Sequence, residues 1–108
     1  MDIDIGAILQ TALGAATDAV RKSAPQVEDY LREIAHGHEA AIRSLAEALA
    51  RGDIDGATFN DEMDDEGRTL QAELQAVAVV TQAIAQRAVN AFRDALVDGI
   101  TTAVQAAL

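Results

Sequence analysis

The sequence predicts an all-α protein that folds as a long antiparallel helical hairpin. Apolar residues recur at spacings of three and four along almost the whole chain, which is the pattern of amphipathic helices. Alanine, a strong helix former, supplies 24 of the 108 residues, whereas only three residues are aromatic. Turn-forming residues gather in two places, at Pro25 and in the segment 52–56. A chain of this length is expected to form a single helical domain over residues 1–108.

The first arm of the hairpin is expected to contain two helices with a bend between them. One helix runs from about 5 to 22, and the next runs from about 25 to 51. The sequence Ser23-Ala24-Pro25-Gln26 fits a capping box with proline in the first helical turn, where the missing N–H costs nothing. The first arm is therefore predicted to bend at Pro25.

The second arm is predicted to be one helix from about 58 to 107. It follows a loop at 52–57, whose glycines and aspartates favour turns, and Thr58 provides a helix cap. At 1.5 Å per residue, this helix would be about 75 Å long. A helix of that length does not fold back on itself, so it is expected to pack antiparallel to the first arm.

Self-association is expected because a two-helix hairpin leaves much of each apolar face uncovered. Five valines of the second arm fall outside its main apolar stripe. We therefore expect a homo-oligomer, and specifically a dimer that forms a four-helix bundle. The predicted interface consists of Val79, Val80, Val89, Val97 and Val104.

Composition and charge argue against several classes of function. Eighteen acidic and eight basic residues give a net charge of −10, so direct nucleic-acid binding, which needs clustered Lys and Arg, is not expected. The absence of cysteine excludes disulfides and thiolate metal sites. No uncharged stretch approaches the roughly 20 residues of a membrane span. Asp2 and Asp4 stand where a signal peptide carries basic residues, so we expect no signal peptide and a location in the cytoplasm or within a larger assembly.

His38 lies at the centre of an apolar stripe, where a leucine would be expected. In an antiparallel hairpin it would lie near Gln71, with Glu73 close by, and Glu66 and Glu73 stand on the edge of the apolar stripe of the second arm. A histidine flanked by glutamates inside a helical bundle can bind iron, zinc or manganese, which makes these three residues candidate metal ligands. The other interpretation is a neutral core histidine that is hydrogen-bonded to Gln71 or to a glutamate.

Glu33 and His36 form a second candidate metal pair. Their Glu-x-x-His spacing is similar to that of the ferritin-like di-iron carboxylate proteins, in which both side chains project into the bundle. The resemblance implies a metal-binding four-helix bundle in which Glu73 supplies a further carboxylate. Because Glu33 and His36 lie off the apolar stripe, this site requires that an oligomer buries the outer face of their helix.

The acidic residues are unevenly distributed along the chain. Residues 25–75 contain 13 acids and four bases, whereas the rest of the chain contains five acids and four bases. One end of the hairpin is therefore acidic, and the alanine-rich remainder forms a nearly neutral apolar shaft. Clustered carboxylates can imitate phosphates, so an inhibitor that mimics nucleic acid is one alternative function.

The architecture favours a non-enzymatic helical interaction or assembly protein. Such a protein would self-associate through its apolar shaft, would present the same surface to a protein partner, and would serve as a small subunit of a larger particle or machine. No catalytic residues and no cofactor are predicted, since the sequence contains neither a serine–histidine–acid set nor a phosphate-binding loop. The main alternative is the metal-binding bundle described above.

Overall fold

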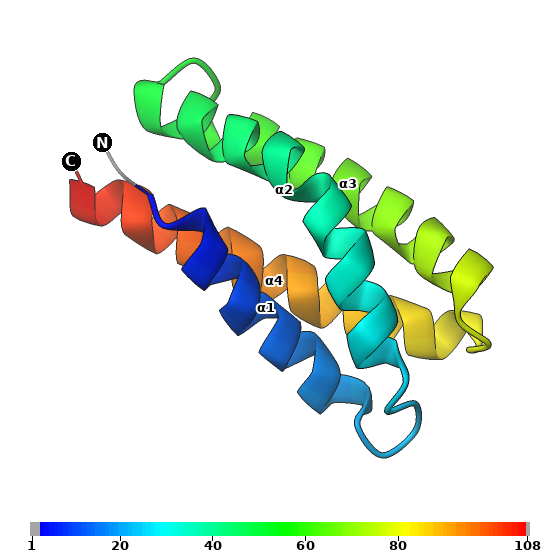
Figure 1. Cartoon of the computed structure of the whole chain (residues 1–108). Helices are drawn as coiled ribbons and strands as arrows, with labels where there is room; N and C mark the ends of the chain where they lie inside the picture. Colours follow the sequence, from blue (N-terminus) through cyan, green and yellow to red (C-terminus); the bar gives the residue numbers. More distant parts are fainter. Residues whose placement is uncertain (1–2, 108) are drawn as a thin grey trace.

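The protein is all-helical, which confirms the predicted fold class at this level. The computed structural model describes residues 3–107, so Asp2 lies outside the described residues. These residues form four helices and no strand (Figure 1). The helices are α1 (Ile5–Val20), α2 (Val27–Arg51), α3 (Gly56–Val77) and α4 (Gln82–Ala107).

The prediction of one helix over residues 58–107 is wrong, because the chain turns between α3 and α4. Ala78 leaves the helical conformation, with φ −105° and ψ 140°. The hydroxyl of Thr81 then accepts a hydrogen bond from the backbone N–H of Ile84 at 3.2 Å and caps the new helix. Val79, Val80 and Thr81 are three consecutive β-branched residues, which lowers the helix propensity of this connector.

This turn replaces the 75 Å hairpin with a short bundle. The Cα atoms extend over 41 × 21 × 19 Å, and their radius of gyration is 13.5 Å. Figure 1 shows α1 beside α4 and α2 beside α3, and these two pairs make the most extensive helix–helix contacts. Four helices of one chain therefore supply the packing that the sequence led us to expect from two chains.

The other two connectors also differ from expectation in their caps. The capping box expected at Ser23 does not form, since α2 begins at Val27 after Gln26 and has no side-chain cap. Gly52 ends α2 with a left-handed φ of 77°, which glycine adopts without steric cost. The cap of α3 is Asp55 rather than Thr58, because the Asp55 carboxylate accepts the Thr58 N–H at 2.8 Å.

All four helices contribute to one core. Its larger members come from the faces of the helices that turn inward, and alanines fill the close contacts between them. The largest fully buried side chains include Phe59, Phe92, Ile5, Leu31, Ile42, Met63, Leu70, Leu74, Leu96 and Ile100.

Candidate functional site

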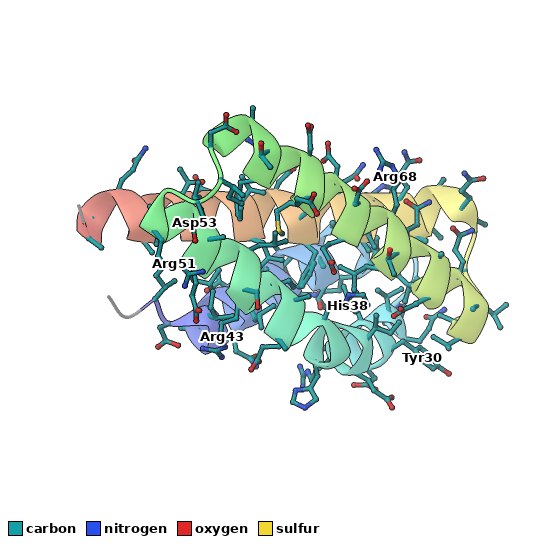
Figure 2. All side chains as sticks on the ribbon, turned by 90° about the horizontal axis from the view of Figure 1, so that it is seen from above. Tyr30, His38, Arg43, Arg51, Asp53 and Arg68 are labelled. Carbon is teal, nitrogen blue, oxygen red and sulfur yellow. The ribbon has the colours of Figure 1, made fainter. Side chains whose placement is uncertain are left out.

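The structure brings His38 of α2 between two glutamates of α3. Nδ1 of His38 lies 2.8 Å from Oε2 of Glu66, and Nε2 lies 3.1 Å from both carboxylate oxygens of Glu73. Glu66 and Glu73 are seven residues apart, so they share one face of α3 two turns from each other. Figure 2 shows His38 on the side of α2 that faces α3. We call these three residues the His38 cluster.

The His38 cluster favours the protonated imidazole. The His38 side chain is 15% exposed, whereas those of Glu66 and Glu73 are 24% and 45% exposed. Burial lowers the pKa of His38, but the hydrogen bonds with Glu66 and Glu73 outweigh this effect and raise the pKa above its ordinary value of 6.5. With a proton on each nitrogen, the ring donates to both carboxylates at once.

The imidazole ring of His38 lies between Glu66 and Glu73, so the two candidate carboxylate ligands are on opposite sides of the ring. Each nitrogen of His38 faces one carboxylate, so an ion beside either nitrogen would meet two protein side chains, whereas zinc sites use three or four. Within residues 3–107 no group of three or more histidine, aspartate or glutamate side chains is arranged to hold a metal ion. The geometry of the His38 cluster is that of a hydrogen-bonded ion-pair network.

Glu33 and His36 do not join this network. Both residues are exposed on α2. The ferritin-like arrangement requires a Glu-x-x-His pair that projects into a bundle. Within the described chain this pair instead projects away from the core, and the structure does not bring it to Glu73.

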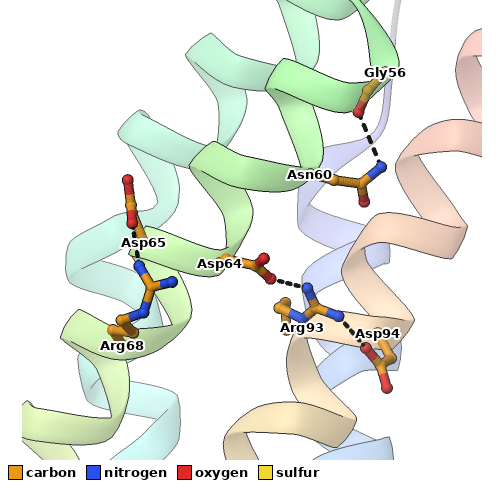
Figure 3. A network of polar contacts seen from close by, with 7 residues as sticks. All are labelled: Gly56, Asn60, Asp64, Asp65, Arg68, Arg93 and Asp94. Carbon is orange, nitrogen blue, oxygen red and sulfur yellow. Dashed lines mark hydrogen bonds and ion pairs between the residues drawn. The ribbon is translucent and has the colours of Figure 1, made fainter.

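Several acids of α3 and of the α2–α3 connector are paired with neighbouring groups. Arg93 of α4 forms ion pairs with Asp64 of α3 and with Asp94, the latter at 2.9 Å (Figure 3). Asp65 pairs with Arg68 on the same helix. The backbone N–H of Thr58 lowers the pKa of Asp55, because the hydrogen bond favours the carboxylate. Asp55 therefore caps α3, and Asp64 links α3 to α4.

The five valines predicted as an oligomer interface do not form one surface. Val89 and Val104 are 2% and 7% exposed, because they belong to the core of the same chain. Their assignment to an interface is therefore corrected. Val80 and Val97 are partly buried against that core, whereas Val79 is 97% exposed.

Sequence reasoning missed an uncharged groove beside the α3–α4 connector. Val79 and the half-exposed Val77 are among its lining residues, and the α1–α2 connector supplies part of its wall. None of the described residues that line it is charged. The groove is lined by Ser23, Ala24, Gln26, Gln75, Ala76, Val77, Ala78, Val79, Val80, Thr81 and Ile84. We call this surface the connector groove; its sequence signal is the uncharged stretch 74–86.

Comparisons with known proteins assign no class to this fold and site. No protein-family model, curated protein or solved structure matches the chain. Among the described helices, none has both the length and the apolar character that crossing a membrane requires.

Proposed function

We propose that this chain is a non-enzymatic helical interaction protein whose copies associate at the connector groove. The observation that carries the proposal is the 97% exposure of Val79. Within residues 3–107, the other large apolar side chains are buried or partly buried, except those of Tyr30 and Val77, which are 40% and 52% exposed. Burial of one such side chain contributes roughly 1.5–3 kcal/mol. An interface at this point would also cover the exposed half of Val77.

The distribution of charge favours a second copy of the chain at this place. The protein carries a net charge of −10, so two copies repel each other over most of their surfaces. The connector groove has no charged residue in its lining, and the chain from 74 to 86 carries none. Two copies can therefore meet there without bringing charged lining residues together.

The shape of this end also suits a symmetric contact. Val79 projects beside the groove that it helps to line, so a twofold axis can place the Val79 of each copy at the groove of the other. Such a contact uses the same patch on both chains and closes at a dimer. This dimer would be the unit that the protein contributes to a larger assembly.

Val79→Asp tests the proposal because it places a charge at the centre of the contact. We expect the dissociation constant of the dimer to rise at least about tenfold in sedimentation velocity experiments. Ala57→Asp is the matched control: Ala57 is exposed in the first turn of α3, at the other end of that helix, and the substitution adds the same charge. A wild-type protein that stays monomeric up to about 1 mM would contradict the proposal.

A further inference from the structure

We propose that two copies of this chain exchange α4 by straightening the α3–α4 connector. In the exchanged dimer, residues 56–107 form one helix of about 78 Å, and α4 of each chain packs on α1 and α3 of the other. This inference rests on the proposed function in that copies associate at this end of the bundle, but exchange of α4 takes the place of the contact between two intact grooves. It also explains why the sequence predicts a continuous helix where the monomer has a turn.

The α3–α4 connector differs from the other two in that it contains no residue that breaks a helix. The α1–α2 connector contains Pro25, and the α2–α3 connector contains Gly52 in a left-handed conformation. Residues 78–81 contain neither glycine nor proline. No residue of this connector therefore excludes the αR conformation, and only the modest propensity cost of three β-branched residues disfavours it.

The apolar pattern continues through the connector without a change of register. Leu74, Ala78 and Ala85 are buried, and they are spaced by four and seven residues. These spacings place residues on one face of a continuous helix. A straight helix over 56–107 would therefore keep a single apolar stripe for packing against its partners.

Exchange restores in the dimer the contacts that α4 makes in the monomer. The α3–α4 connector alone joins α4 to the other three helices, so one hinge releases it. The ion pair of Arg93 with Asp64 and the packing of Gly99 against Ile8 would re-form between chains. In a reciprocal exchange the two hinges lie beside each other at the twofold axis, which would cover Val77 and Val79.

The turn at Val79 suggests a variant that fixes the bent form. The Val80 N–H donates to the Ala78 carbonyl at 3.0 Å, which makes Val79 the centre of a γ-turn. Since no non-glycine residue in 3–107 has a positive φ, this is an inverse γ-turn, whose central residue has a φ of about −75°. Proline prefers almost the same φ, and the extended Ala78 is suited to precede it. Val79→Pro thus fits the monomer but not a straight helix.

Variants of the connector provide the first experiment that tests this inference. Val79→Pro keeps an apolar side chain in place, so it is expected to preserve a surface contact but to weaken exchange at least about a hundredfold. Thr81→Ala removes the cap of α4 from the bent form alone, and we expect it to strengthen dimerisation about tenfold. Asp55→Ala is the matched control, because it removes the α3 cap beside Gly52, where no straightening occurs. Circular dichroism establishes that each variant is folded.

An introduced cysteine pair provides the second experiment, because it identifies which chain supplies α4. A Cβ placed on Gly99 would lie 3.7 Å from the Cβ of Ile8, which matches the spacing of a disulfide, and the chain has no other cysteine. In the double variant Ile8→Cys/Gly99→Cys, the isolated dimer should oxidise to a covalent dimer in denaturing gels. The isolated monomer should form the bond within one chain.

The outcomes separate this inference from the proposed function. A dimer that contains only intrachain disulfides and persists in Val79→Pro would overturn exchange and leave surface association standing. The absence of a dimer in both the wild type and Thr81→Ala up to about 1 mM would overturn both. Interchain disulfides, together with loss of the dimer in Val79→Pro, establish exchange of α4.

Discussion

His38 makes the contact between α2 and α3 dependent on pH. The folded state holds the proton of His38 more tightly than the unfolded chain, since the pKa is raised above 6.5. The resulting stabilisation is complete below about pH 6.5 and is lost as the pH rises through the higher pKa of the folded state. We therefore expect the Tm difference between wild type and His38→Gln to shrink as the pH increases from 6 to 9, as measured by thermal melts.

His36→Gln is the control for this prediction. His36 lies two residues away on the same helix but is exposed, so its replacement should leave the pH profile of Tm unchanged. Glu66→Gln should reduce the pH dependence, because it removes one of the two carboxylates that hold the proton. A constant Tm difference between wild type and His38→Gln across this range would show that the His38 cluster does not bind the proton in the way inferred.

The residues of the His38 cluster could be found from the sequence because their proximity depends only on two helices that are consecutive in the chain. Two antiparallel helices joined by the loop at 52–55 bring His38 opposite α3, whatever follows Val77. The protonation of the ring could not be found in this way, since it depends on distances to two carboxylates. The interface prediction for Val89 and Val104 was wrong for a different reason. Other helices of the same chain cover these side chains, and the positions of those helices depend on the turn at 78–81, which was not predicted.

At the level of helix pairs, Gly99 allows α4 to approach α1 closely. A Cβ on Gly99 would lie 2.9 Å from Cγ2 of Ile8, a β-branched side chain with little freedom to move. We expect Gly99→Ala to lower the free energy of unfolding by about 1 kcal/mol in urea titrations, since overpacking outweighs the gain in helix propensity.

Gly37→Ala is the matched control for this packing argument. Gly37 is also inside a helix, but a Cβ there would meet nothing within 4 Å. The same substitution should therefore raise the free energy of unfolding by about 0.5–1 kcal/mol. Equal effects of the two substitutions would mean that the contact between Gly99 and Ile8 does not constrain the packing of α1 and α4.

The helical segments were largely predictable, but the connector between α3 and α4 was not. Pro25 and the glycines at 52 and 56 mark two connectors clearly, because these residues restrict or extend the available backbone conformations. The third connector contains only residues that a helix accepts, and its one positive signal is Thr81 as a cap. The apolar surface that is buried when α4 packs on α1 outweighs the weak preference of residues 78–81 for a continuous helix. This burial is a property of the tertiary fold, so the local sequence does not reveal it.

For the molecule as a whole, the turn at 78–81 decides between two very different shapes. The bundle has a radius of gyration of 13.5 Å for its Cα atoms. A hairpin built on a 75 Å helix would behave as a rod with a radius of gyration of about 22 Å. Small-angle scattering of the monomer fraction should therefore give a value slightly above that of the Cα atoms, since side chains and hydration water add to it.

Concentration separates the monomer from any dimer in this measurement. At the lowest concentrations, scattering mass and radius should together correspond to one compact chain. If copies associate by exchange of α4 alone, Val79→Pro should retain both values as the concentration rises. A dimer with exchanged α4 contains a helix of about 78 Å, so the wild type should then show a longer maximum dimension together with a doubled mass. A monomer mass combined with a rod-like radius would instead mean that α3 and α4 are continuous within a single chain, and the four-helix bundle would be the wrong description of the protein in solution.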